Sequence, residues 1–227
     1  MSIAIIGGGL AGCECALALA RAGVASTVFE CKPALYSPAH VIPGLAELVC
    51  SNSLRSDEPV TAVGLLKVEM AELGSAVIAA ARETAVPAGK ALAVDRDLFS
   101  AAMTARIEAE ERVTLVRREI MGLSDPALAG FEAVVVAGGP LASERLAASL
   151  LEAIGGEGLY FYDAIAPIVT TDSVDMDKAF WASRWQEGEG DYLNCPLTKD
   201  EYMTFLTELL AARKVPSREF EKELHFE

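Results

Sequence analysis

The fold is decided by residues 2–30, which read SIAIIGGGLAGCECALALARAGVASTVFE. A short apolar run at Ser2–Ile6 is followed by three glycines, and then by small and apolar residues at helical spacing as far as Arg21. A second apolar run, Ala25–Glu30, ends in an acid. This order of strand, glycine turn, helix and strand predicts a βαβ unit, for which about 30 residues suffice.

The glycine turn has the spacing of a dinucleotide-binding site. The G-x-G-x-x-G pattern is matched by Gly7, Gly8, Gly9, Leu10, Ala11 and Gly12. In this pattern the first glycine permits a tight turn, the second lets a pyrophosphate approach the backbone, and the third lets helix and strand pack closely. The helix N-terminus attracts the phosphates, and we expect Glu30 to accept hydrogen bonds from a ribose diol. The alternative is a glycine-rich turn in an unrelated α/β protein.

A later apolar run bears on which dinucleotide is bound. Residues 131–137 form a strand pattern with a continuous apolar run at 133–137, which ends in Gly138 and Gly139. Such a run is typical of a parallel strand covered on both faces. Flavoproteins that bind two dinucleotides often carry a second strand of this kind beside the cofactor. The pattern therefore favours FAD over NAD, against the alternative of an ordinary core strand with a glycine cap.

Composition sets the broad class of protein. The chain has 227 residues, of which 52% are hydrophobic and 23% charged, and this excludes wholesale disorder. No apolar run approaches the roughly 18 residues of a membrane span, and five cysteines without framework spacing suit a reducing compartment. We expect a cytoplasmic protein without a membrane partner. Because the net charge is −14, contact with nucleic acid requires a local basic patch.

The predicted fold class is α/β. A Rossmann-like FAD-binding domain with a parallel sheet is expected over residues 1–91 and 114–158, with an inserted smaller α/β domain over 92–113 and 159–227. Helical spacing predicts helices at 62–84, 95–110, 141–154 and 198–212. One face of the first is expected to be buried through Leu65, Leu66, Met70, Leu73, Val77 and Ile78.

Two candidate residues lie in the long aperiodic stretch after Glu30. Cys50 is followed by hydroxyl and amide side chains and by Arg55, a setting that favours a thiolate, although a packing role is the simpler interpretation. His40 either lines a ligand pocket or is satisfied within its own proline-rich loop, and the second is the simpler interpretation. No Cys or His spacing resembles a zinc site, so no metal site is predicted.

Longer motifs resemble one known family, the folate- and FAD-dependent tRNA (uracil-5-)-methyltransferases (TrmFO). The resemblance is carried by the glycine turn and by the motifs PAH at 38–40, ELVCSNSLRS at 47–56, SVDMDK at 173–178 and DYLNCP at 191–196. It spans nearly the whole chain. The chain departs from the family at Ala137, where the family more often has threonine before the glycine.

The resemblance implies a reaction and its participants. Methylenetetrahydrofolate gives a one-carbon unit, reduced FAD carries and reduces it, NAD(P)H recharges the flavin, and the methyl group ends on uridine C5 in the tRNA T-loop. In this family a cysteine thiolate adds to uracil C6 and a second cysteine helps to remove the C5 proton. Cys50 matches the cysteine usually given the second role. The resemblance implies substrate or pocket residues at His40, Asn52, Ser53 and Arg55.

The end of the chain suggests a longer protein. The other family cysteine follows a Phe-Glu-Gly-Cys-Met-Pro segment, and this chain stops at Phe226-Glu227, where that segment begins. We therefore expect the front part of an enzyme whose second half, or a partner chain, completes it. Two alternatives stay open: a non-catalytic or partner-completed flavin-binding fragment, and a general FAD-dependent oxidoreductase that needs neither folate nor tRNA.

Overall fold

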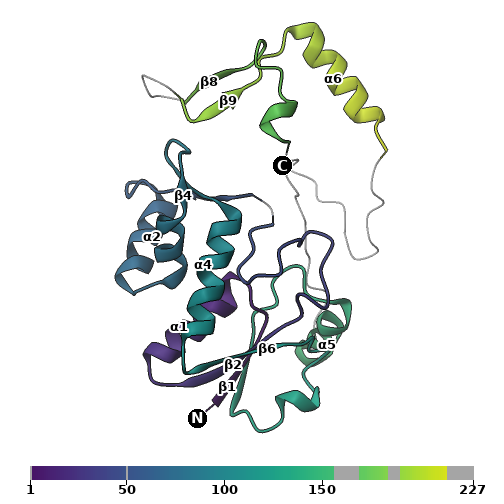
Figure 1. Cartoon of the computed structure of the whole chain (residues 1–227). Helices are drawn as coiled ribbons and strands as arrows, with labels where there is room; N and C mark the ends of the chain where they lie inside the picture. Colours follow the sequence, from purple (N-terminus) through teal and green to yellow (C-terminus); the bar gives the residue numbers. More distant parts are fainter. Residues whose placement is uncertain (1, 50, 156–168, 184–189, 214–227) are drawn as a thin grey trace. The chain divides into compact units, whose positions relative to one another are not determined.

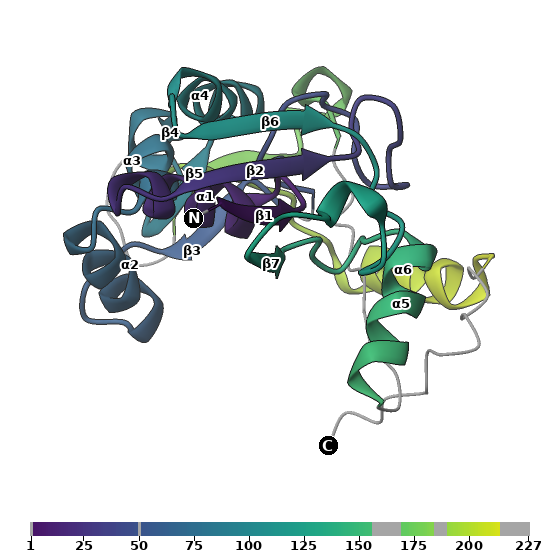
Figure 2. The same ribbon diagram turned by 90° about the horizontal axis from the view of Figure 1, so that it is seen from below.

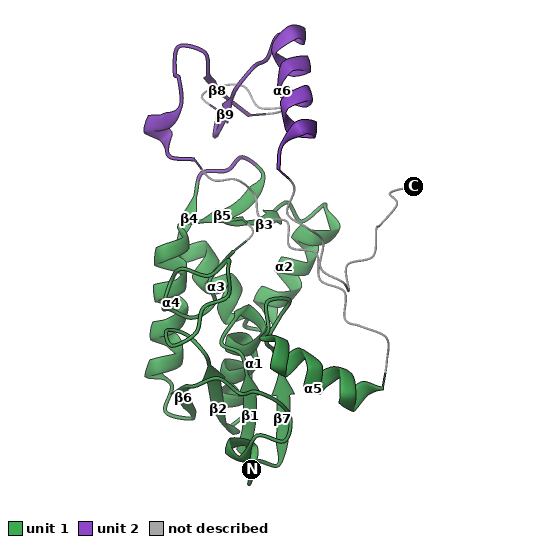
Figure 3. Cartoon of the chain, turned by 90° about the vertical axis from the view of Figure 1, so that its right-hand side faces the viewer, with its two compact units in different colours: residues 1–86, 90–166 green, residues 87–89, 167–227 purple. Residues whose placement is uncertain are grey.

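A computed structural model of the chain describes residues 2–49, 51–155, 169–183 and 190–213 (Figure 1). The chain divides into two compact units, which are coloured separately in Figure 3. The first unit comprises residues 1–86 and 90–166, and the second comprises residues 87–89 and 167–227. Cys50 and residues 159–168 of the expected smaller domain lie outside the described residues.

The first unit is built on a parallel four-stranded sheet, as the sequence predicted (Figure 2). Its strands are β1 (Ser2–Ile6), β2 (Ala25–Glu30), β6 (Val113–Arg117) and β7 (Ala133–Val136), in the order β6-β2-β1-β7. The helices of this unit are α1 (Leu10–Arg21), α2 (Ala62–Glu72), α3 (Ala76–Glu83), α4 (Arg96–Ala109) and α5 (Glu144–Ile154). The predicted βαβ unit is therefore confirmed with its predicted bounds.

Alternation along β1 divides the core between the two faces of the sheet. Ile3 and Ile5 belong to the larger buried cluster, which also contains side chains from α1, α3 and α4. Ala4 and Ile6 belong to the smaller cluster on the other face, where Leu146 of α5 is buried. Because neighbouring side chains of a strand point to opposite faces, one short strand contributes to both clusters. Both layers thus extend to the end of β1, where the glycine turn begins.

The single helix predicted over 62–84 is wrong, because the structure contains α2 and α3 with a break between them. Gly74 has a φ of +77°, and the Ser75 side chain accepts a hydrogen bond from the Ile78 N–H as the N-cap of α3. The expected apolar face is therefore split. Its members in α3 are buried, whereas Leu65, Leu66 and Leu73 are exposed. A glycine and a serine in sequence were the available signal of this break.

The strand predicted at 131–137 forms, but its expected burial on both faces is wrong. Within the described residues β7 pairs with β1 alone, so it lies at one edge of the sheet. Its side chains at Val134 and Val136 are 37% and 38% exposed. A continuous apolar run thus marked an edge strand here, because the pattern reports hydrophobicity and not the number of neighbours.

A small antiparallel sheet adjoins the helical layer of the first unit. It contains β3 (Ser53–Ser56), β5 (Ala91–Val94) and β4 (Ala85–Val86), in the order β3-β5-β4. Residues 92–113, which the sequence suggested for the smaller domain, fall in the first unit. The reason is that Leu92, Val94 and the apolar face of α4 belong to the larger buried cluster.

The second unit contains a short hairpin and one helix. Its elements are β8 (Phe180–Ala182), β9 (Tyr192–Asn194) and α6 (Lys199–Ala211). At the start of α6, Thr198 and Glu201 form a capping box. The Asp191 carboxylate accepts a hydrogen bond from the Gly89 N–H at 2.6 Å, which links the 87–89 turn to the hairpin. Among the helices of the described residues, none is long and apolar enough to cross a membrane.

The N-terminus of α3 is held by a side chain of α1, and this contact yields a prediction about stability. The Glu14 carboxylate accepts hydrogen bonds from the Ser75 hydroxyl and from the N–H groups of Ala76 and Val77. Replacement Glu14→Ala is expected to lower the free energy of unfolding by about 1–3 kcal/mol, because it removes an anion from a helix N-terminus together with its hydrogen bonds. Urea denaturation measures this, with the exposed Glu72→Ala as the matched control, and equal midpoints would contradict the prediction.

Candidate functional site

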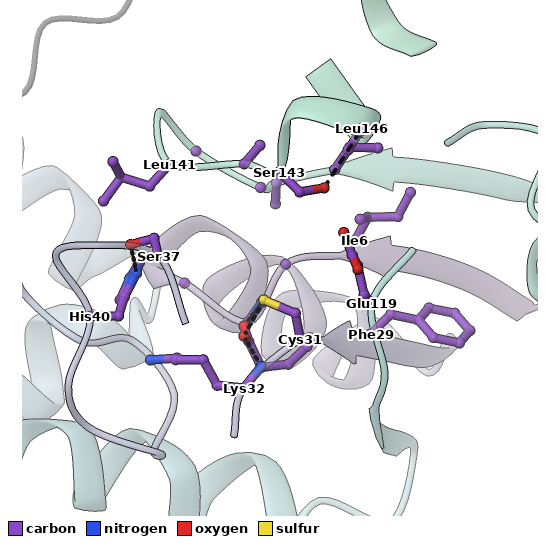
Figure 4. A pocket seen from close by; sticks show the side chains of 18 of the residues that line it. Ile6, Phe29, Cys31, Lys32, Ser37, His40, Glu119, Leu141, Ser143 and Leu146 are labelled. Atoms are coloured by element: carbon purple, nitrogen blue, oxygen red, sulfur yellow. Dashed lines mark hydrogen bonds between the residues drawn. The ribbon is translucent and has the colours of Figure 1, made fainter. Parts of the chain in front are cut away.

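A pocket of about 340 Å³ opens at the carboxyl edge of the parallel sheet (Figure 4). Residues that follow each of the four strands line it, which is where ligands bind in open α/β sheets. Figure 4 shows Cys31, Lys32, Ser37 and His40 along one side and Leu141, Ser143 and Leu146 along the other. The structure brings residues 7–11, Glu30, His40, Gly138 and Gly139 together around this pocket, whereas Gly12 does not line it.

The glycines of the turn differ in what surrounds them. Gly7 has a φ of +107°, and a Cβ there would lie 2.6 Å from the Ala137 carbonyl oxygen. A Cβ at Gly12 would lie 1.9 Å from the Gly7 carbonyl oxygen. At Gly9, by contrast, a Cβ would meet nothing within 4 Å, and the residue lines the pocket. The first and third glycines thus permit close packing of the protein itself, while the backbone at Gly9 is open to a ligand.

The positive end of α1 faces the pocket. Gly9 is the N-cap residue, no side chain caps the helix, and the first turn contains no acid. Leu10 and Ala11 of that turn line the pocket. Uncapped N–H groups and the helix dipole together favour a phosphate at this position.

The Glu30 carboxylate holds the glycine turn in place through hydrogen bonds. The side chain is buried, Oε2 accepts from the Gly8 N–H at 2.8 Å, and Oε1 accepts from the Lys32 N–H at 2.8 Å. Oε1 also accepts from the Cys31 thiol at 3.3 Å. A carboxylate oxygen has about two acceptor sites, so Oε2 retains one for a hydroxyl of a bound ribose. The acid therefore orients the loop and remains able to bind a diol.

The three described cysteines near the turn are not poised for reaction. Burial, followed by the charge of Glu30, raises the pKa of Cys13 to about 12 and that of Cys31 to about 11. Burial also raises the pKa of Cys15. Their thiols therefore stay protonated at neutral pH.

His40 lines the pocket and contacts its own loop. Its Nδ1 lies 2.6 Å from the Ser37 hydroxyl oxygen. Burial, with a smaller contribution from the charge of Lys32, lowers the pKa of His40. The imidazole is therefore neutral at pH 7 and keeps its Nε2 for another partner.

Three of the predicted substrate or pocket residues do not line this pocket. Asn52 donates through its side-chain amide to the Val94 carbonyl at 3.0 Å, and Ser53 belongs to β3 of the small sheet. Arg55 is exposed and has a φ of +66°. On the other side of Cys50, the Arg96 guanidinium donates to the Leu48 carbonyl oxygen. Contacts with β5 and α4 thus hold the chain on both sides of Cys50.

Sequence reasoning missed several residues that line the pocket. These are Lys32, Glu47, Arg118, Glu119, Ile120 and the start of α5. A usable signal existed for the residues after β6, because the carboxyl ends of parallel strands meet at one edge. Glu47 had no such signal, since it lies in an aperiodic stretch and reaches the pocket only through the path of the loop.

Gly8, the residue between the first two glycines of the motif, is also closely packed. A Cβ at Gly8 would lie 2.6 Å from Leu45 Cδ2 and 2.9 Å from Glu30 Oε2. We expect Gly8→Ala to lower the free energy of unfolding by about 1–3 kcal/mol through overpacking, and Gly9→Ala to change it far less. Thermal denaturation of the two variants compares them directly, and equal losses would contradict the assigned packing.

The raised thiol pKa values predict a pattern of chemical labelling. At pH 8, iodoacetamide is expected to modify the exposed Cys195 quickly and to leave Cys13 and Cys31 largely unmodified, because the thiolate is the reactive form. Peptide mass spectrometry gives the extent at each site, and labelling in denaturant provides the control. Fast labelling of Cys31 in the native chain would refute this prediction.

Comparisons with known proteins agree with the geometry of the pocket. Residues 2–227 match the family described as glucose inhibited division protein A. Proteins named methylenetetrahydrofolate–tRNA-(uracil-5-)-methyltransferase TrmFO match as well. Those from Oleidesulfovibrio alaskensis and Lawsonia intracellularis are 62% and 57% identical over 100% of this chain, and that from Nitratidesulfovibrio vulgaris (strain DP4) is 66% identical over 99%.

The resemblance seen in the sequence is thereby confirmed. The chain spans about half the length of these curated relatives, covering 51%, 51% and 47% of them respectively. The family match extends over almost every residue, including both sides of the pocket and the second unit. This chain belongs to the family of glucose inhibited division protein A.

Proposed function

We propose that the chain provides the FAD-binding part of a methylenetetrahydrofolate-dependent tRNA (uracil-5-)-methyltransferase. The observation that carries the proposal is the cradle at the carboxyl edge of the sheet, in which Gly9 and the uncapped N-terminus of α1 lie beside Glu30. The relatives named TrmFO supply the reaction class. Because tRNA is the proposed substrate, we also propose a cytoplasmic location.

The residues of the pocket fit the adenosine diphosphate part of FAD. We assign the pyrophosphate to the N–H groups of Leu10 and Ala11, which line the pocket at the uncapped N-terminus of α1, and the ribose hydroxyls to Glu30. Gly139 lines the opposite side, and a Cβ there would meet nothing within 4 Å. When bound, FAD supplies the redox chemistry that delivers the one-carbon unit at the oxidation level of a methyl group. NAD(P)H is the proposed reductant.

Cys50 is the proposed acid–base residue. Uracil C5 is a weak nucleophile, and addition of a thiolate at C6 makes it reactive. After C5 has acquired its one-carbon substituent, a base must remove the C5 proton before the thiolate can leave. On the basis of the family motif, we assign the removal of this proton to Cys50. Leu48 and Asn52, two residues to either side of it, are held by hydrogen bonds to Arg96 and Val94.

A second candidate function follows from the length of the match. The chain spans about half the length of its relatives. The second candidate is a flavin-binding part that acts only when another polypeptide completes the enzyme. This candidate predicts flavin binding without methyl transfer.

The two candidates are separated by binding and activity measured on the same preparation. We expect the purified chain to bind FAD. The same preparation is assayed with methylenetetrahydrofolate, NADPH and unmodified tRNA, and formation of 5-methyluridine would assign the whole reaction to this chain. Cys50→Ala is expected to keep FAD and to lose activity by about 10²-fold or more, as removal of a general acid–base does. Cys195→Ala, an exposed cysteine, is the matched control.

Flavin binding without methylation supports the partner-completed function. Full activity of Cys50→Ala refutes the role given to that residue, and failure of the chain to bind FAD refutes the proposed function itself.

A further inference from the structure

Residues 37–47 form one side of the pocket, and we call them the wall segment. Glu47, at its end, forms a buried ion pair with Lys32. Lys32 Nζ is 2.9 Å from Glu47 Oε2, and the two side chains are only 5% and 0% exposed. Both residues line the pocket. A buried ion pair contributes little to stability, because the desolvation of both charges offsets their attraction. Its presence beside a pocket therefore calls for another explanation.

Glu47 uses its two oxygens for different purposes. While Oε2 accepts from Lys32, Oε1 accepts from the N–H groups of Val41 and Ile42 at 2.8 and 3.0 Å. One carboxylate thus joins the residue that follows β2 by two positions to the middle of the wall segment. Val41 is exposed, so these two hydrogen bonds tie a surface turn to a buried carboxylate. They consequently fix the position of this turn.

The backbone beside Glu47 is held in an unfavourable conformation. Ala46 is fully buried and has a φ of +51°, a left-handed value that residues with a Cβ seldom adopt. Its N–H donates to the Gly8 carbonyl oxygen at 2.8 Å, and this bond joins the wall segment to the glycine turn. Such strain persists only where surrounding contacts determine the backbone. Glu47 provides those contacts on one side, and the bonds of Leu45 with Ser100 and Thr104 provide them on the other.

We infer that the ion pair between Lys32 and Glu47 is a positioning device, which holds the wall segment against the glycine turn so that the pocket is shaped before the dinucleotide binds. The inference rests on the proposed function insofar as the dinucleotide is FAD. Lys32 and Glu47 act through Ala46 and Gly8, which adjoin the phosphate-binding end of α1. Their effect is on affinity and on the order of the wall segment, and the stability of the fold depends on them little.

The decisive variant replaces both charges at once. In Lys32→Met/Glu47→Leu no buried charge is left unpaired, so the FAD-free chain is expected to melt at the same temperature as the wild type or higher. Its affinity for FAD, measured by quenching of flavin fluorescence, is expected to fall roughly tenfold or more, because the wall is no longer preorganised. The matched control is Lys90→Met/Glu58→Leu, which removes a pair with the same 2.9 Å separation whose side chains are 50% and 36% exposed.

Reversal of the pair separates charge from position. Lys32→Glu/Glu47→Lys keeps one charge of each sign, but a lysine at 47 cannot accept hydrogen bonds from Val41 and Ile42. We expect FAD affinity to stay low in this variant. Restoration of wild-type affinity would overturn the inference, since it would show that the acceptor role of Glu47 is unnecessary.

Hydrogen exchange gives a readout that needs no ligand. In the FAD-free double variant, amides of residues 41–47 are expected to exchange faster than in the wild type, while those of β1 and α1 are unchanged. Unchanged exchange in 41–47, or wild-type affinity for FAD, would overturn the inference. A melting temperature that falls in step with affinity would overturn it as well, by showing a structural role. If the wild type binds no FAD, the proposed function fails, and the exchange experiment still decides the inference.

Discussion

The hydrogen bond from the Gly8 N–H to the Glu30 carboxylate is the interaction on which the pocket depends. It joins the turn after β1 to the end of β2, and the same carboxylate accepts from the Lys32 N–H. The Gly8 carbonyl oxygen in turn accepts from the Ala46 N–H and from the Cys13 thiol. Strand, helix and wall segment thus meet at one residue without a side chain. A larger residue there would displace Leu45 or Glu30.

Sequence patterns predicted those parts of the fold that local chemistry determines. The βαβ unit could be predicted to the residue, because strand periodicity, a glycine turn and a terminal acid agree at each boundary. The break at Gly74 and Ser75 was missed because apolar spacing continues through it, although both residues signal a helix end and a new start. The edge position of β7 could not be predicted, since pairing is a property of the sheet and not of the strand.

The residues of the candidate site likewise divide into those that a local motif predicts and those that only the fold brings together. Gly7, Gly9, Glu30 and His40 could be assigned to a pocket from their motif or loop, and the structure places them around one. Asn52, Ser53 and Arg55 belong to the small sheet and its flank, because their segment pairs with β5 in preference to facing the pocket. Nothing local in the sequence joins Lys32 to Glu47, fifteen positions apart, because the contact exists only once the loop has closed.

The edge strand β7 relates the negative charge of the chain to its self-association. Within the described residues one side of β7 is not paired, and its valines are partly exposed, so that a strand from a second copy could add to it. A net charge of −14 makes copies repel one another over about one Debye length. High salt, or a pH close to the sequence pI of about 4.6, removes this repulsion and leaves the edge free to self-associate. The edge of β7 is thus one place at which the net charge of the chain opposes pairing with a second copy.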